Sequence, residues 1–554
     1  MPGGPSVLWR RRPTRAHNIY MDHTVRRIAP VTLRRWLADG AELALLDARE
    51  EGEFGASHLF WAVPCPFSRR EDRAHALLPR KSVRLVCLDD GRGVAEALAA
   101  WMIADGYTDV SVLDGGTRAW ATAGGELFSG INVPSKAFGE WVEHHYGTES
   151  VDPAELKSWL DQGRKMVVLD SRTEAEFRRM SIPTGISVPG GELAYRIGDL
   201  APDPDTLVVV NCAGRTRSIM GAESLRRAGI PNKVVALRNG TMGWELAGLR
   251  CEHGRTERFP PGPPKTAALA LQRATAFAEA SGVRVARPRD IAGFAADPTR
   301  SLYLLDVRDP AEFRAAHHPA SHNAPGGQLV QATDGWIAVR NARIVLLDDD
   351  GVRARASAAW LRQMGQPEVY VVEGGFAALT DLVPAPPPEP ATSVPLIEVL
   401  RLTEALDTGT PTVIVDVARS LDYREGHIPG AAWGVRGRLG VLRGALEGAR
   451  LVVATSSDGT LAQRAVAELQ ALCTAEVAAL DGGTAAWHAF GRPLVKDRTT
   501  PPDAACVDAH LRPYDRNSGV EAAMRAYLSW EIDLVHQIVR DGTVRFGVEA
   551  VAGA

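Results

Sequence analysis

The 554-residue sequence has few cysteines and no long uninterrupted run of apolar residues. Its six cysteines lie far apart, and no two of them form a Cys-x-x-Cys pair. This pattern argues against a disulfide framework and against a zinc site, and it favours a reducing compartment. The arginine-rich start lacks the apolar core of a secretory signal, and Met21 is a second candidate for the first residue. We therefore expect a cytoplasmic protein that does not bind to membranes.

Neither a strong charge nor a high aromatic content marks the sequence. The formal net charge is −4, and aromatic residues make up 6% of the chain. A balance so close to neutral excludes a general affinity for nucleic acid or for anionic lipid, so we expect no nucleic-acid partner. Hydrophobic residues make up 45% of the chain. They can fill several cores, and the length predicts about three to five domains.

One pattern occurs four times along the chain. Each copy has an apolar strand that ends in aspartate, then an acidic and an aromatic residue, a second strand, a loop and a helix. The first strands end at Asp47, Asp170, Asp306 and Asp416, and three copies close on a tryptophan, at Trp120, Trp244 and Trp487. Strands that alternate with helices at this spacing predict parallel sheets covered on both faces. Proline-rich segments at 253–265 and 384–390 are expected to act as spacers.

A cysteine lies at the turn between a strand and a helix of the second copy. Three valines at 208–210 predict a buried strand, and apolar residues at helical spacing from Ile219 predict the helix. The first turn of a helix has N–H groups without partners, which favour an anion in the turn. Arg215 and Arg217 add positive charge, so we expect the thiolate of Cys212 to be favoured and nucleophilic.

The run Cys212-Ala213-Gly214-Arg215-Thr216-Arg217-Ser218 resembles the active-site loop of the rhodanese superfamily, and the four repeats resemble the rhodanese pattern over residues 22 to 497. The resemblance implies an α/β protein with four tandem rhodanese-like domains, each a parallel sheet flanked by helices. The expected domains are 22–127, 149–252, 283–383 and 395–497, followed by a helical C-terminal extension at 503–554.

The resemblance also implies an activity. In this superfamily a loop cysteine carries a persulfide, so we expect a sulfurtransferase in which Cys212 takes sulfur from thiosulfate or 3-mercaptopyruvate. The acceptor would be cyanide or a thiol, with glutathione and thioredoxin as candidates. No cofactor and no metal is expected.

Roles for the loop residues follow from the same resemblance. The N–H groups of Ala213 to Arg217 would hold the charged outer sulfur. We assign Arg215 to the anionic end of the donor, Arg217 to closing the loop, and Ser218 to a hydroxyl near the sulfur. Asp170 and Arg172 recur in copies that lack the cysteine, so we interpret them as a structural ion pair beneath the loop.

The other three copies lack a cysteine at the loop. An aspartate stands there in the first copy, within Asp89-Asp90, and in the third, within 348–350, while Thr455 or Ser456 does so in the fourth. Cys87 precedes the first of these loops and is expected to be buried in a strand. We predict that these copies are catalytically silent and either build the rim of the site, hold a partner, or only stabilise the fold.

Three further expectations concern the remaining motifs. His317, His318 and His322 have no matching cysteine or acidic ligand at metal spacing, so we expect solvated loop histidines. A helix predicted at 521–540 has a polar face poor in lysine and arginine, which favours docking on the preceding domain or on a second copy of the chain over a membrane surface. Docking on a second copy would make a homodimer. The segment 129–150 is expected to pack against the first two copies.

Two other functions remain open from the sequence. A cysteine-dependent phosphatase or arsenate reductase also uses an anion-binding loop with an arginine, but its loop is one residue longer than the six residues from Cys212 to Arg217. A non-enzymatic persulfide carrier or scaffold would instead deliver the sulfur of Cys212 to one protein partner. The loop does not choose between the donors.

Overall fold

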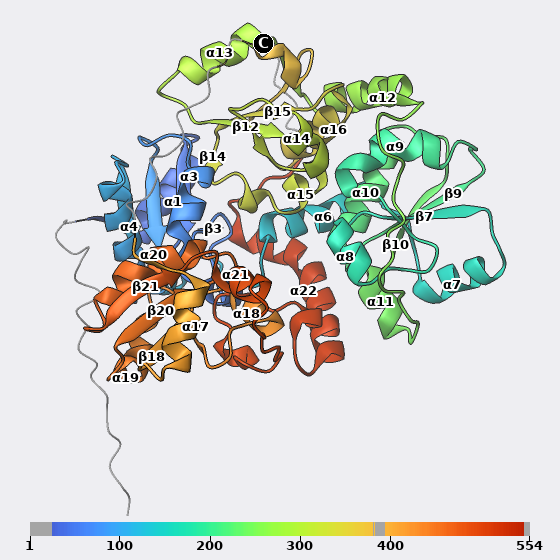
Figure 1. Ribbon diagram of the computed structural model, residues 1–554. Helices are drawn as coiled ribbons and strands as arrows, with labels where there is room; N and C mark the ends of the chain where they lie inside the picture. The colour runs from blue at the N-terminus through green and yellow to red at the C-terminus, as the bar shows by residue number, and fades with distance from the viewer. Residues whose placement is uncertain (1–24, 381, 383–393, 548–554) are drawn as a thin grey trace, which may run out of the picture.

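The computed structural model describes residues 25–380, 382 and 394–547, and the candidate start Met21 and the proline-rich segment 384–390 lie outside them. Within the described residues the chain forms four β-sheets, each built mainly from parallel strands (Figure 1). We call the parts of the chain that carry them units 1 to 4, in chain order. Four parallel-sheet units flanked by helices confirm the predicted fold class. No helix in the described ranges is both long and apolar enough to cross a membrane.

Unit 1 has the sheet order β1-β5-β4-β2-β14, in which β14 comes from unit 3. Its elements are β1 (Arg26–Ile28), α1 (Pro30–Ala38), β2 (Leu43–Asp47), α2 (Glu51–Ala56), β3 (Val63–Pro64), α3 (Arg70–Leu77), β4 (Leu85–Leu88), α4 (Val94–Ala104), β5 (Val110–Leu113) and α5 (Gly116–Thr122). Cys87 lies in β4 and is fully buried, as predicted.

A linker helix, α6 (Val133–Tyr146), leads to unit 2, whose strands are all parallel in the order β6-β10-β9-β7-β8. The elements of unit 2 are β6 (Ser150–Val151), α7 (Pro153–Asp161), β7 (Met166–Asp170), α8 (Glu174–Arg179), β8 (Ile186–Ser187), α9 (Leu193–Leu200), β9 (Leu207–Asn211), α10 (Thr216–Arg227), β10 (Val234–Leu237) and α11 (Gly240–Leu246). Val208 and Val210 of β9 join one apolar cluster and Val209 joins another. Successive side chains of a strand point to opposite faces, so this sheet has a core on both sides.

Unit 3 follows helix α12 (Ala267–Ala280) and repeats the order as β11-β16-β15-β12-β13. Its elements are β11 (Arg284–Ala286), α13 (Pro288–Ala296), β12 (Leu302–Asp306), α14 (Pro310–Ala315), β13 (His322–Asn323), α15 (Gly326–Gln331), β14 (Val339–Arg340), β15 (Arg343–Leu347), α16 (Val352–Gln363) and β16 (Glu368–Val372).

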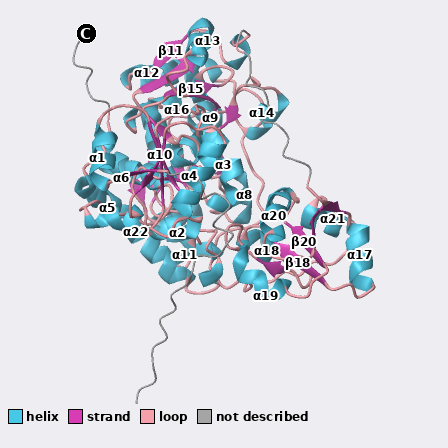
Figure 2. Cartoon of the chain, turned by 90° about the vertical axis from the view of Figure 1, so that its left-hand side faces the viewer, coloured by secondary structure: helices cyan, strands magenta, loops and turns pink. Residues whose placement is uncertain are grey.

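Unit 4 has the order β17-β21-β20-β18-β19, and in Figure 2 its strands lie among its helices. Its elements are β17 (Leu396–Ile397), α17 (Val399–Asp407), β18 (Thr412–Asp416), α18 (Ser420–Glu425), β19 (Ala432–Trp433), α19 (Arg443–Leu446), β20 (Leu451–Thr455), α20 (Thr460–Gln470), β21 (Glu476–Leu480) and α21 (Gly483–Ala489).

The units are joined by shared sheets and cores. Strand β14 pairs antiparallel with β2, so unit 3 extends the sheet of unit 1. Units 2 and 3 approach each other through glycines, because a Cβ atom on Gly191 would lie 2.8 Å from the backbone nitrogen of Gly327. Phe138 and Val142 of α6 belong to an apolar cluster that also holds residues of units 1, 2 and 3. This linker therefore packs against the first two units, as expected, and against the third.

The C-terminal extension crosses the molecule instead of staying on the unit that precedes it. Its helix α22 (Val520–Asp541) lies beside α6, between unit 1 and unit 2 (Figure 1). Leu534 and Ile538 pack with Phe60 and Phe128 of unit 1, while Met524 and Leu528 pack with Met242 of unit 2. The expectation that this helix docks on the preceding domain was therefore wrong, since it packs against units 1 and 2. Docking on a second copy of the chain stays a prediction.

Candidate active site

Cys212 directly follows the buried strand β9 and precedes the first turn of α10. The start of α11 holds this turn in place, because the N–H groups of Thr241 and Met242 donate to the carbonyl oxygens of Cys212 and Ala213, at 2.8 and 3.0 Å. Gly240 has a φ of +53°, and a Cβ atom there would lie 2.2 Å from the Cys212 oxygen. A glycine is therefore required for α11 to approach the loop so closely.

The thiol of Cys212 is buried, with 1% of the residue exposed. Its Sγ atom lies 3.5 Å from the Oγ atom of Ser218, which in turn donates to the carbonyl oxygen of Arg215 at 2.8 Å. Burial raises the pKa of Cys212 above the usual value, whereas the charge of Arg217 and hydrogen bonding with Ser218 lower it. The expectation of a favoured thiolate is therefore corrected: removing the sulfur from water outweighs the positive charge nearby.

Arg217 and Arg172 lie on the side of the loop that faces α8. The guanidinium of Arg217 forms a two-point ion pair with Glu176, at 2.7 and 2.8 Å. The positive charge of Arg217 holds the pKa of Glu176 well below its usual range despite burial. Arg172 is paired with Asp170 at 2.7 Å, and both are buried. This geometry agrees with a structural role for the second pair.

The buried aspartate beneath the loop has different partners in different units. Arg49 pairs with Asp47, and Arg308 pairs with Asp306, as Arg172 does with Asp170. In unit 4 the position of the arginine is taken by Ala418, whose N–H donates to Asp416 at 2.9 Å. Without a cation beside it, burial raises the pKa of Asp416 to about 7.

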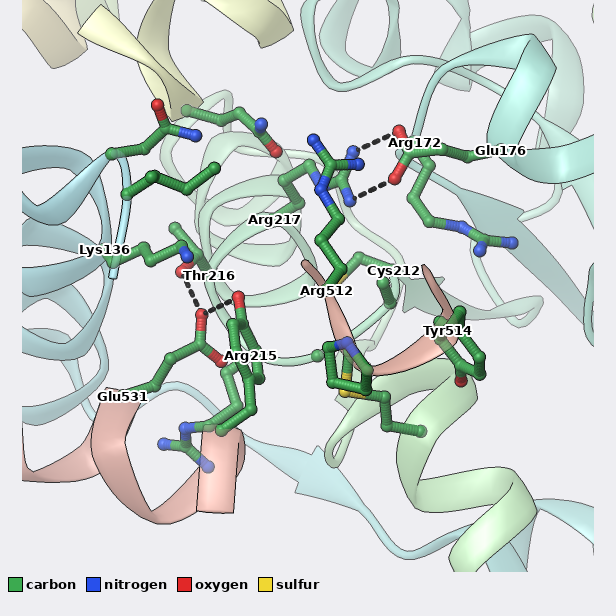
Figure 3. A pocket seen from close by; sticks show the side chains of 18 of the residues that line it. Lys136, Arg172, Glu176, Cys212, Arg215, Thr216, Arg217, Arg512, Tyr514 and Glu531 are labelled. Carbon is green, nitrogen blue, oxygen red and sulfur yellow. Dashed lines mark hydrogen bonds and ion pairs between the residues drawn. The ribbon is translucent and has the colours of Figure 1, made fainter. Parts of the chain in front are cut away.

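Arg215 points away from Cys212 toward α6 (Figure 3). Its guanidinium donates to both carboxylate oxygens of Glu140 at 2.8 Å and also pairs with Glu143. A guanidinium held by two carboxylates has little capacity left for a donor anion. The structure thus places Arg215 where it fastens the loop to the linker helix.

The C-terminal extension supplies one wall of the site, and no pattern in the sequence predicts this. A cavity of about 320 Å³ opens over Cys212 and is lined by the loop, by α6, α8 and α15, and by the extension. The lining residues from the extension include His510, Arg512, Tyr514, Tyr527 and Glu531. They lie about 300 positions along the chain from the loop, and no spacing or motif connects them to it.

Glu531 of α22 contacts the loop directly (Figure 3). Its Oε1 atom accepts hydrogen bonds from the Thr216 hydroxyl at 3.2 Å and from the Tyr527 hydroxyl at 2.8 Å. Its Oε2 atom is buried and has no hydrogen-bond partner in the described part of the chain. A Cβ atom on Gly214 would lie 3.1 Å from Oε2, so the carboxylate rests against the loop. The negative charge of Glu531 contributes to the raised pKa of Cys212.

Strand register identifies which residue replaces the cysteine in the other units. Asp170 of β7 pairs with Asn211 of β9, and Cys212 follows Asn211. The corresponding pairs are Asp47 with Leu88, Asp306 with Leu347, and Asp416 with Thr455. The residues at the cysteine position are therefore Asp89, Asp348 and Ser456. Of the two candidates in unit 4, Ser456 holds that position and Thr455 ends the strand.

The carboxylates of units 1 and 3 occupy the loop themselves. Asp89 accepts from the N–H groups of Gly91 and Val94, at 2.7 and 2.8 Å. Asp348 accepts from the N–H of Gly351 at 2.7 Å in the same way. Each aspartate side chain thus accepts the hydrogen bonds of N–H groups that could otherwise bind an anion. A carboxylate cannot carry a persulfide, which explains in chemical terms why these copies are expected to be silent.

The histidines of unit 3 form no metal centre. Within the described ranges no group of three or more histidine, cysteine, aspartate or glutamate side chains is placed to hold a metal ion. His317 and His322 are exposed. His318 is buried, and its Nδ1 atom accepts from the N–H of Ala320 at 3.1 Å. The expectation of solvated histidines was therefore wrong for His318, which caps a turn.

Comparison with known proteins identifies the family. The family model of the rhodanese-like domain matches four segments of the chain, residues 29–123, 152–247, 292–381 and 399–490. The chain therefore belongs to the rhodanese-like family, with four such domains in tandem.

A solved structure extends the likeness to nearly the whole chain. The crystal structure of a thiosulfate sulfurtransferase from Pseudomonas aeruginosa is 45% identical, covers 95% of this chain and 100% of that one, and superposes with a TM-score of 0.89. The thiosulfate sulfurtransferase GlpE of Vibrio cholerae is 29% identical over 79 residues, which are 14% of this chain and 73% of that protein. The probable adenylyltransferase/sulfurtransferase MoeZ of Mycobacterium tuberculosis is 38% identical over 95 residues, which are 17% of this chain and 24% of MoeZ. The chain thus matches about a quarter of the length of MoeZ.

Proposed function

We propose that the protein is a sulfurtransferase that moves the outer sulfur of thiosulfate to a small thiol or to cyanide through a persulfide on Cys212. The observation that carries the proposal is the placement of Cys212, in the lining of a cavity and beside the Ser218 hydroxyl. Of the four described units, unit 2 alone has a cysteine at this loop position. The names of the similar sulfurtransferases support the same class of reaction.

The first half-reaction forms the persulfide. Cys212 loses its proton to solvent, and the thiolate attacks the outer sulfur of thiosulfate. A bond forms between the two sulfur atoms, the sulfur–sulfur bond of thiosulfate breaks, and sulfite leaves with the bonding electrons. The positive charge of Arg217 stabilises the anionic sulfur of the Cys212 thiolate and of the persulfide, because it acts from a fixed position in a buried site.

The second half-reaction returns the enzyme to its thiol form. An acceptor thiolate, or cyanide, attacks the outer sulfur of the persulfide, the bond to Cys212 breaks, and the Cys212 thiolate is released. The products are an acceptor persulfide or thiocyanate. No oxidant or reductant is consumed, because each step exchanges one nucleophile for another at the same sulfur atom.

Burial of Cys212 supports a small acceptor over a protein acceptor. The residue is 1% exposed, and the extension covers the loop from the side of α22. A cysteine on the surface of a folded partner would have to displace this cover to reach the sulfur. Of the two thiol acceptors considered, we therefore favour glutathione over thioredoxin. The same burial disfavours a carrier that delivers sulfur to one protein.

The loop length disfavours a phosphatase. Helix α10 begins at Thr216, so four residues separate strand β9 from the helix. A phosphoryl group with its oxygens needs a wider ring of N–H groups than one sulfur atom does, and the phosphatase loop is one residue longer. We therefore do not propose phosphoryl chemistry at Cys212.

Steady-state assays test the proposal. Purified protein is expected to turn over thiosulfate with cyanide, and the Cys212→Ser variant is expected to lose this turnover. A variant that keeps turnover would contradict the assignment of Cys212. Cys87→Ser is the matched control, since Cys87 is fully buried in β4 and should not affect the reaction.

A further inference from the structure

The cavity over Cys212 contains an excess of positive charge, most of which is already neutralised. Six lysine and arginine side chains line it in the described part of the chain, and four of these have a carboxylate partner. The ion pairs are Arg172 with Asp170, Arg179 with Asp515, Arg215 with Glu140, and Arg217 with Glu176. The two remaining cations are Lys136 and Arg512, which are the ones free to bind a substrate anion.

Lys136 reaches the cavity from the linker helix α6. Its Nζ atom lies 4.7 Å from the ring centroid of Tyr527 and 4.6 Å from that of Trp530, both on α22. Within the described residues it forms neither a hydrogen bond nor an ion pair. Burial lowers the pKa of Lys136 to about 8, opposed by the charge of Glu531 and assisted by that of Arg512. The Lys136 ammonium thus has two aromatic rings as neighbours but no carboxylate in an ion pair.

Arg512 reaches the same cavity from the extension. It is exposed and directly precedes the short turn Pro513–Asp515, which Arg179 fastens to unit 2 through Asp515 and the Tyr514 carbonyl. Its guanidinium has no hydrogen bond or ion pair with any described residue. Figure 3 shows it on the same side of Cys212 as Arg217. The charge of Arg512 also helps to lower the pKa of Glu176.

Two cations without an ion-pair partner in one cavity repel each other, and a doubly charged anion between them removes this repulsion. A guanidinium offers a planar fork for two oxygens, and an ammonium offers a compact charge for the third. Glu531 carries a negative charge in the same cavity, but its carboxylate lies against Gly214 of the loop and forms no ion pair with Lys136 or Arg512 in the described part of the chain.

Resting on the proposed function, we propose that Lys136 and Arg512 bind the sulfonate end of thiosulfate and make the site selective for small dianionic sulfur donors. The outer sulfur then faces Cys212. This assignment replaces Arg215, which is occupied by Glu140 and Glu143. It also distinguishes the two donors, because the carboxylate of 3-mercaptopyruvate carries one charge instead of two. Neither cation lies within a segment that the family model matches.

Thiosulfate binding to the Cys212→Ser variant tests this inference without turnover. Calorimetry is expected to detect one thiosulfate per chain, and adding Lys136→Met or Arg512→Met should weaken binding at least about tenfold each. Methionine keeps the apolar stem of either residue. Arg516→Met, at an exposed arginine four positions further along the extension, is the matched control and should bind as Cys212→Ser does.

Kinetics with the native cysteine separate the inference from the proposed function. Lys136→Met and Arg512→Met should raise the KM for thiosulfate about tenfold or more while changing kcat less, and should raise the KM for 3-mercaptopyruvate by a smaller factor. If native protein turns over thiosulfate but both variants keep its KM and its calorimetric affinity, the inference fails and the proposed function stands. Equal KM increases for the two donors would overturn the selectivity for dianions. Absence of turnover in the native protein would contradict the proposed function. Calorimetry would still show whether Lys136 and Arg512 bind thiosulfate.

Discussion

Weakening the docking of α22 should expose the catalytic cysteine. Leu534 is fully buried, and it packs with Phe60, Phe128, Val133 and Ala137. Truncating a buried leucine to alanine costs about 2–5 kcal/mol. If α22 undocks as a unit, the undocked population should rise about thirtyfold or more in Leu534→Ala, since each 1.4 kcal/mol is about a factor of ten.

The rate of Cys212 alkylation by iodoacetamide measures this population. We expect the rate to rise in Leu534→Ala by up to the same factor, because the cavity over Cys212 already admits small reagents and undocking of α22 removes one of its walls. Peptide mass analysis assigns the label to Cys212, and Val539→Ala, at a position 76% exposed on the same helix, should react as the native protein does. A native rate in Leu534→Ala, accompanied by a lower thermal midpoint, would refute the view that α22 controls access.

Three further variants test the electrostatics. Glu531→Gln removes a negative charge that raises the pKa of Cys212, so the pH profile of alkylation should move to lower pH; an unmoved profile would show that the carboxylate does not act on the sulfur. Arg217→Met removes the positive charge that lowers the pKa of Cys212, together with the two-point pair to Glu176, so the profile should move to higher pH and turnover should fall about tenfold or more. Asp416 stays protonated in the folded protein up to a pKa of about 7 but ionises near 4 when unfolded, so stability falls as pH rises between these values. Asp416→Asn should remove up to about 4 kcal/mol of this loss, seen as a flatter dependence of the thermal midpoint on pH; an equally steep dependence would show that another group causes it.

The repeated fold could be predicted from the sequence because each unit repeats local signals. A buried strand that ends in aspartate, a loop and an amphipathic helix recur four times, and in three units the aspartate holds an arginine two positions along. These contacts are short in sequence, so spacing alone reveals them. The position of Cys212 before α10 follows from the same local pattern.

The walls of the site could not be predicted, because they depend on contacts between distant segments. Glu531 reaches the loop because α22 packs beside α6 and not on unit 4, and Arg512 reaches the cavity because Arg179 of unit 2 fastens the turn that follows it. The two arginines of the loop look equivalent in sequence, and the carboxylates that engage them come from different helices, α6 for Arg215 and α8 for Arg217. Part of the raised pKa of Cys212 has the same origin, since the charge of Glu531 on α22 contributes to it and cannot be inferred from the loop sequence.

The mass of the intact protein after exposure to thiosulfate tests the central claim most directly. We expect one added sulfur atom per native chain, located on Cys212 by peptide analysis and removed by cyanide, and no added sulfur on Cys212→Ser. Sulfur added to another cysteine, or retained by the variant, would contradict the account.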